Sequence, residues 1–233
     1  MKVFPVVHIN NTERAVHEAE VALDMGADGV YLIDHHGGEP DTTFEVFNTI
    51  DEHRPDAYVG VNLLGYSSAD VLRTMRDAHQ RRELVRIPDG VWIDDVRHSG
   101  NMSPREVFEY KQNDSVLRSM RILGGIAFKY TRSYTDDPGK AQDEVGSLES
   151  AVDVVTTSGK GTGSAPSASK IRAMHEASTK PIAVASGISL DNIGDYRGFV
   201  DEILVASSVE TAPYSGVFNQ GELRAFIEAA HRD

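Results

Sequence analysis

Eight strand-like runs alternate with amphipathic helical segments along nearly the whole chain of 233 residues. The runs are short and apolar, and the alternation with helices is typical of parallel α/β folds. Eight such units favour a closed barrel over a doubly wound sheet, which commonly has about five or six strands. We therefore predict a (β/α)8 TIM barrel, with residues 1–233 forming one domain. The predicted strands are Val3–Ile9, Gly29–Ile33, Tyr58–Leu63, Val91–Asp95, Arg121–Phe128, Val152–Thr156, Pro181–Ala185 and Glu202–Ala206.

The segments between the strands carry helix signals. Thr12–Met25 places small apolar residues on one face and stops at Gly26, as helices often do. Ser103-Pro104-Arg105-Glu106 has the pattern of a capping box with proline at the first helical position. The segment Arg81–Asp89 has room for a short extra strand. The other predicted helices are Thr42–Glu52, Ser68–Gln80, a short one around Asp143–Ala151, Ser167–Ser178 and Gln220–His231.

Composition excludes several classes of protein. The formal net charge of −13 argues against a surface for nucleic acid or for an anionic membrane, since both need lysine and arginine. The absence of cysteine excludes disulfides, thiolate metal sites and cysteine nucleophiles. No signal-peptide pattern opens the chain, and no window approaches about 18 consecutive apolar residues. We expect a soluble, cytoplasmic protein without membrane insertion, and a homo-oligomer, since most soluble oligomers assemble from identical chains.

The last third of the chain, Val152–Val209, predicts an anion site. Three of its strands end in small residues, which leave backbone N–H groups open to an anion. In TIM barrels the phosphate site commonly follows strands seven and eight, where helix N-termini add partial positive charge. The alternative is that the glycines only make tight turns. We expect a small phosphorylated or anionic substrate, bound by Thr157, Ser158, Gly159, Thr162, Gly163, Ser186, Gly187, Ile188, Ser207 and Ser208.

Polar residues also end the first five strands, where the chemistry of a TIM barrel is found. Neighbours on a strand point to opposite sides, so one of His35 and His36, and one of Asp94 and Asp95, faces the mouth. General acid–base chemistry is the simplest role, and hydrogen bonding to the backbone is the structural alternative. A divalent metal is a possible cofactor, and no other is indicated. The predicted catalytic residues are His8, Asp34, His36, Asn62, Asp95 and Lys129.

Lys129 has three interpretations. It is a fixed cation that steers a phosphate or carboxylate, a Schiff-base nucleophile whose pKa is lowered by an apolar mouth, or an ordinary surface lysine.

The stretch Thr156–Pro166, followed by a helix and then Pro181–Ser189, resembles the signature of the BtpA family, which includes SgcQ-like proteins. His8, Gly60-Val61-Asn62 and Lys129 match family positions after the first, third and fifth strands. Asn192 and Ile203–Val209 fit the same pattern, whereas Asp34–Pro40 and Asp94–Asn101 depart from it. The resemblance implies a TIM barrel. It also implies either a role in photosystem I biogenesis, as for the founding members, or activity on sugars or nucleosides.

Together these observations predict an enzyme that binds a phosphorylated small metabolite at the C-terminal mouth of the barrel. The metabolite is a sugar phosphate, nucleoside or nucleotide, and the resemblance favours transfer or cleavage at a sugar carbon. One alternative is a BtpA-like assembly or regulatory protein without turnover. A second is a Schiff-base aldolase that uses Lys129.

Overall fold

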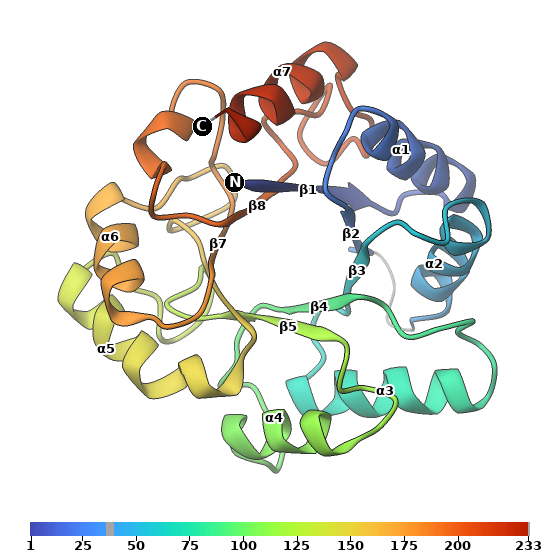
Figure 1. The fold of residues 1–233 in the computed structure, drawn as a ribbon, viewed down its shortest axis with the longest axis horizontal. Helices are drawn as coiled ribbons and strands as arrows, with labels where there is room; N and C mark the ends of the chain where they lie inside the picture. Colours follow the sequence, from blue (N-terminus) through green and yellow to red (C-terminus); the bar gives the residue numbers. More distant parts are fainter. Residues whose placement is uncertain (36–39, 233) are drawn as a thin grey trace.

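Eight parallel strands close into a barrel in this computed structural model, which describes residues 1–35 and 40–232. Each strand pairs with the next in sequence, and β8 returns to β1 (Figure 1). The predicted (β/α)8 TIM barrel is therefore confirmed. The strands are β1 (Lys2–His8), β2 (Val30–Ile33), β3 (Val59–Asn62), β4 (Gly90–Ile93), β5 (Arg121–Gly125), β6 (Val154–Thr157), β7 (Ile182–Ala185) and β8 (Glu202–Val205).

Helices ring the barrel, and all of the described α-helices except Asp41–His53 begin at a residue whose side chain caps them. The Asn11 side chain accepts the Arg14 backbone N–H at the start of the first helix, and the predicted capping box of Ser103 and Glu106 is present. Among the described residues, none of the helices is long and apolar enough to cross a membrane. The helices are α1 (Thr12–Asp24), α2 (Asp41–His53), α3 (Ser68–Gln80), α4 (Pro104–Asn113), α5 (Pro138–Leu148), α6 (Ala168–Ala177) and α7 (Gln220–His231).

Three segments differ from the sequence-based expectations. Helix α5 starts five residues earlier than predicted because Asp137 caps it and Pro138 occupies its first turn, and Glu149–Ala151 forms a separate 3₁₀ turn. The segment 81–89 is a loop, held by ion pairs from Arg86, and contains no strand. After β7 there is only a short 3₁₀ helix, η2 (Ile193–Tyr196), and α7 begins well beyond the end of β8. We expected the N-termini of α-helices directly after β7 and β8 to add partial positive charge at the phosphate site. No α-helix of the described chain begins directly after either strand.

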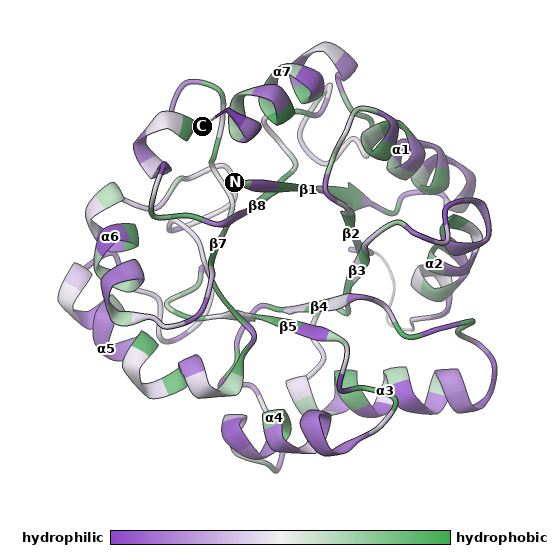
Figure 2. Cartoon of the chain, viewed as in Figure 1, coloured by the Kyte–Doolittle hydropathy of each residue, from purple (hydrophilic) through white to green (hydrophobic). Residues whose placement is uncertain are grey.

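Alternate strand residues separate an inner from an outer core. Figure 2 shows mostly hydrophobic strands, with hydrophilic residues concentrated on the helices. Outward-facing residues such as Val3 and Val7 pack with the helices in the larger core. Because successive side chains on a strand point to opposite sides, every second residue of each strand faces the inside of the barrel. The inner core contains Phe4, Val6, Tyr31, Ile33, Trp92, Leu123, Phe128, Val154, Ala183, Ala185 and Leu204.

Polar and aromatic side chains fill the N-terminal end of the barrel. Arg121 pairs with Glu202 at 2.6 Å, and the Tyr31 and Tyr58 hydroxyls hydrogen-bond at 2.9 Å. A Cβ at Gly60 would clash with the Tyr31 ring, so glycine is required for this packing. Burial raises the pKa of Tyr31 well above its usual value of 10.0. This end is therefore a packed floor.

Candidate functional site

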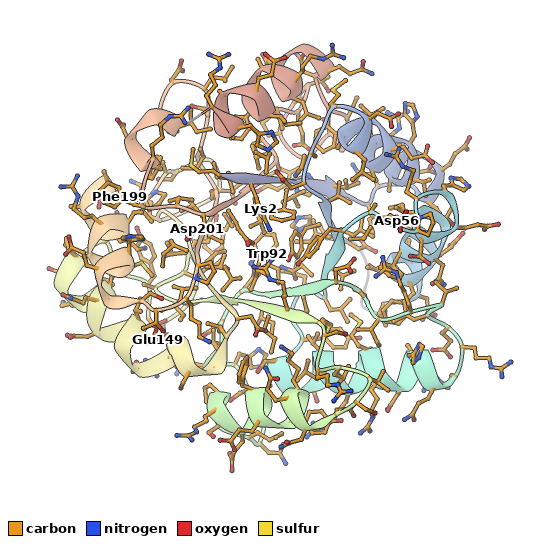
Figure 3. All side chains as sticks on the ribbon, in the orientation of Figure 1. Lys2, Asp56, Trp92, Glu149, Phe199 and Asp201 are labelled. Atoms are coloured by element: carbon orange, nitrogen blue, oxygen red, sulfur yellow. The ribbon has the colours of Figure 1, made fainter. Side chains whose placement is uncertain are left out.

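A cavity of about 900 Å³ lies at the C-terminal ends of the strands. This is within the range of pockets that hold a drug-sized molecule. Trp92 projects from β4 inside the ring of strands and forms part of the cavity wall (Figure 3). The other lining residues are Val6, His8, Asn10, Ile33, His35, Leu64, Asp94, Lys129, Tyr130, Thr162, Gly163, Ala185, Ser186, Gly187, Ile188, Ser189, Asn192, Leu204, Val205, Ala206, Ser207, Ser208 and Tyr214.

The loops after β7 and β8 form one side of the cavity and present unpaired backbone donors. Within the described chain, the N–H groups of Gly187, Ile188, Ser207 and Ser208 donate no hydrogen bond. The two loops are joined to each other because the Ser208 hydroxyl donates to the Ile188 carbonyl at 2.7 Å. Asn192 stabilises the β7 loop by donating to the Gly187 carbonyl at 2.9 Å. Clustered free N–H groups of this kind bind anions.

Ser186 and Gly187 have a structural role in addition to lining the cavity. The Ser186 hydroxyl accepts the Gly163 N–H at 3.0 Å and donates to the Gly161 carbonyl at 3.1 Å. Gly187 has φ +74°, and a Cβ there would clash with the backbone of Ala165. These contacts fix the loop after β6 against the loop after β7, so Gly187 is required for close approach as well as for its turn.

Thr157, Ser158 and Gly159 do not line the cavity. The Thr157 hydroxyl donates to the Ala127 carbonyl at 3.3 Å, and the Ser158 hydroxyl accepts the Lys129 N–H at 2.8 Å. A Cβ at Gly159 would clash with the Ser164 carbonyl oxygen. The structure therefore places these three predicted ligand-binding residues in the barrel wall, where they hold the loops after β5 and β6.

A buried lysine strengthens the same wall. Lys170 on α6 is fully buried, and its Nζ donates to the carbonyl oxygens of Ala127 and Ser158, each at 2.8 Å. Burial lowers its pKa from an ordinary 10.5 to about 8, partly offset by Asp136. Lys170 thus links α6 to the loops that follow β5 and β6.

His8 and Glu210 form a buried pair at the end of β1. His8 Nδ1 lies 2.8 Å from Glu210 Oε1, and the Glu210 side chain is fully buried. Glu210 also accepts the backbone N–H groups of Tyr214 and Gly216. A carboxylate is an acceptor, so we place the proton of a neutral His8 ring on Nδ1. Nε2 is then the basic nitrogen of a ring that lines the cavity.

Asp94, Asn62 and Lys129 form a second polar group on the opposite wall. Asn62 Nδ2 donates to Asp94 Oδ1 at 3.2 Å, and Lys129 Nζ donates to the Thr162 hydroxyl at 3.3 Å. Burial raises the pKa of Asp94, although Asn62 and Lys129 act in the other direction. Burial lowers the pKa of Lys129, against the pull of Asp94 and Tyr130. An acid that retains its proton more readily therefore lies near an amine that loses its proton more readily.

The strand register decides between neighbouring candidates. Ile33 and Trp92 face inward, so His35 and Asp94 also face inward and line the cavity, whereas Asp34 and Asp95 do not. The Asp95 side chain instead accepts the Arg97 backbone N–H at 2.9 Å. The predicted catalytic residues Asp34 and Asp95 therefore do not line the cavity, whereas their neighbours His35 and Asp94 do, and the catalytic roles themselves stay predictions. His36 lies outside the described residues.

The structure brings together most of the predicted residues and adds others. Of the predicted set, His8, Lys129, Thr162, Gly163, Ser186, Gly187, Ile188, Ser207 and Ser208 line the cavity, and Asn62 contacts it through Asp94. Glu210 and Tyr214 were not predicted. Glu210 lies in a loop without a recognisable motif, and only the barrel closure of β8 onto β1 brings it to His8. No group of three or more His, Asp or Glu side chains among the described residues is arranged to hold a metal ion.

The sequence matches no protein-family model and no curated protein. In structure, the chain is similar to phosphoribosyl anthranilate isomerase from Thermococcus kodakaraensis, with a TM-score of 0.66 and 14% identity over 99% of both chains. Monomers of the dimeric phosphoribosylanthranilate isomerase of Thermotoga maritima give a TM-score of 0.66 and 12% identity over 99% of this chain and 98% of that one. (S)-3-O-geranylgeranylglyceryl phosphate synthase from Thermoplasma acidophilum, in complex with sn-glycerol-1-phosphate, gives a TM-score of 0.61 and 13% identity over 98% and 92%. At these identities the likeness shows the TIM-barrel fold. The BtpA resemblance stays a prediction.

Proposed function

We propose that this protein is an enzyme that acts on a phosphorylated small metabolite bound at the C-terminal mouth of the barrel. The observation that carries the proposal is the set of unpaired N–H groups after β7 and β8. The residues that bear them line the same cavity as two acid–base groups, His8 and Asp94. The similar structures named above are enzymes of phosphorylated compounds, which supports this class of substrate. The phosphate would accept hydrogen bonds from Gly187, Ile188, Ser207 and Ser208.

The two acid–base groups enter the cavity from β1 and from the loop after β4, three strands apart. His8, held by Glu210, has a free Nε2 suited to accept a proton, and Asp94 has a raised pKa suited to deliver one. Lys129 supplies a cation beside Asp94 that stabilises negative charge as it develops. An acid and a base on opposite walls suit substitution at a carbon between them.

We propose transfer or cleavage at a sugar carbon as the reaction. The nucleophile, water or an acceptor hydroxyl, gives its proton to His8 Nε2 as its oxygen bonds to the carbon. The bond from that carbon to the leaving group breaks, and Asp94 gives its proton to the leaving atom. The electron pair of the broken bond stays with the leaving group, so the products are the substituted sugar phosphate and the protonated leaving group.

Phosphate binding is tested with inorganic phosphate and ribose 5-phosphate, using Ser207→Asp and Ser207→Ala. Aspartate places a negative charge in the proposed site, whereas alanine keeps the backbone N–H groups. Saturating ligand should raise the melting temperature of the wild type and of Ser207→Ala by about 5 °C or more, and that of Ser207→Asp by none. Equal shifts in all three proteins, or no shift in the wild type, would refute the phosphate site.

A Schiff-base aldolase is the second candidate, since burial lowers the pKa of Lys129 and favours its neutral, nucleophilic form. Borohydride reduction in the presence of phosphorylated aldehydes and ketones should then trap an adduct at Lys129, found by mass spectrometry of the digested protein. Lys129→Arg keeps the charge and serves as the control. An unmodified Lys129 across the panel would eliminate this candidate.

A further inference from the structure

Two exposed tyrosines at the cavity have strained backbones. Tyr130, after β5, has φ +63° and is 78% exposed, and Tyr214, after β8, has φ +60° and is 47% exposed. Bulky residues with positive φ are uncommon, because glycine or asparagine adopts this conformation at lower energy. Neither ring contributes to the buried core. The Tyr130 hydroxyl accepts the Thr162 N–H at 3.1 Å, which gives that tyrosine a structural role, whereas the Tyr214 hydroxyl makes no hydrogen bond among the described residues. Strain of this kind concentrates at ligand-binding sites.

Tyr214 is part of an aromatic group beside the base-capable histidine. Its ring centroid lies 5.3 Å from that of His8 and 5.7 Å from that of His35, and the two histidine rings are 5.2 Å apart. All three rings line the cavity. These separations are typical of interacting aromatic rings. The backbone N–H of Tyr214 is held by Glu210, which fixes the position of the loop that carries the ring.

The cavity has more room than a phosphosugar alone requires. Its volume of about 900 Å³ lies near the upper end of the range for drug-sized ligands. The loop after β8 contributes both Ser207 and Ser208 of the proposed phosphate site and Tyr214 of the aromatic group. A ligand with phosphate at one end and a flat ring at the other would therefore contact two parts of one loop within the same cavity.

We propose that the substrate is a phosphate monoester whose sugar carries an aromatic ring, and that Tyr214 and His35 bind this ring. The inference deepens the proposed function and relies on it for the location of the phosphate. The ring of the ligand lies beside His8 and is held by stacking. Stacking tolerates many ring types, so the site requires an aromatic ring but discriminates little between different rings.

The test compares ribose 5-phosphate with adenosine 5′-monophosphate and uridine 5′-monophosphate by calorimetry. The wild type should bind at least one of the two nucleotides about tenfold more tightly than ribose 5-phosphate. Tyr214→Asn relieves the backbone strain and removes the ring, so it should fold at least as stably and lose this preference. Tyr214→Phe should keep the preference, and ribose 5-phosphate affinity should stay the same in all three proteins.

Adenosine without phosphate separates this inference from the proposed function. Binding of adenosine that Tyr214→Asn weakens about tenfold, with no response to inorganic phosphate, would support the ring site and refute the phosphate site. Equal affinity for ribose 5-phosphate and both nucleotides would overturn the ring site and leave the phosphate site standing. A nucleotide preference that survives in Tyr214→Asn would also overturn the assignment to Tyr214, and absence of binding by every probe would overturn both.

Discussion

Replacing Lys170 with methionine tests how the buried ammonium is held. Methionine has a similar length and fills the same space without charge. The wild-type lysine is protonated and buried below about pH 8, whereas the unfolded chain keeps its lysine pKa near 10.5. This difference corresponds to a penalty of about 3 kcal/mol in the folded state at pH 7. The variant removes that penalty but leaves the Ser158 carbonyl without its partner, which costs about 1–3 kcal/mol.

The two effects nearly cancel at pH 7, so the informative quantity is the pH dependence. The folded pKa lies below the unfolded one, and the unfolded chain therefore binds more protons between about pH 8 and about pH 10.5. Stability consequently rises with pH in this window for the wild type. Between about pH 7 and about pH 9.5, the wild type should gain about 2 kcal/mol relative to Lys170→Met. The neutral amine still donates two hydrogen bonds, so the contacts to Ala127 and Ser158 persist.

Urea unfolding at a series of pH values measures this gain as a difference, which cancels the other groups that titrate in both proteins. Lys160→Met, at an exposed lysine in the loop after β6, is the control and should run parallel to the wild type. Parallel curves for Lys170→Met and the wild type would refute the buried-ammonium reasoning.

Two further predictions concern the cavity itself. Gly187→Ala should destabilise the protein by about 1–3 kcal/mol in urea and abolish the phosphate-induced thermal shift, because φ is +74° and the new Cβ meets the Ala165 backbone. Gly146→Ala, in α5 where a Cβ has open space, should instead stabilise by about 0.5–1 kcal/mol, and the same sign for both would contradict the close-packing argument. Asp94→Asn should lower kcat by about 10²–10⁴-fold, since it removes the proton donor. Asp94→Asn should also raise the free energy of unfolding at neutral pH. The pKa of Asp94 is higher in the folded protein than in the unfolded chain, so the wild type loses stability as pH rises through these two pKa values. A lower free energy of unfolding in Asp94→Asn would contradict this sign.

The fold was accessible from the sequence because each unit carries its own signals. The capping box at Ser103 and the glycine stop at Gly26 mark the ends of helices, and eight units in succession leave few topologies. The start of α5 differs from the prediction because the segment before it is polar, and neither the cap at Asp137 nor the first-turn Pro138 adds to the apolar periodicity. Boundaries depend on such single contacts, which the periodicity of apolar residues does not record.

The site was only partly accessible, for a reason that lies in the strands. Fully buried parallel strands are apolar on both faces, so β2 and β4 show no alternation that tells inward from outward. That is why Asp94 was not separated from Asp95, nor His35 from its neighbours. Glu210 was missed because its partner His8 is 202 residues away in the chain. The small-residue loops were visible, but which of them face the cavity depends on packing against Ala165.

The barrel has a packed floor at its N-terminal end and the cavity at its C-terminal end. The floor consists of Arg121, Glu202, Tyr31 and Tyr58. Its contacts are made between strand beginnings, and none involves a loop at the mouth. Substitutions at the two ends should therefore combine additively, to within about 0.5 kcal/mol. The mouth loops, and with them the ligand that the cavity binds, can therefore be changed without removing any contact of this floor.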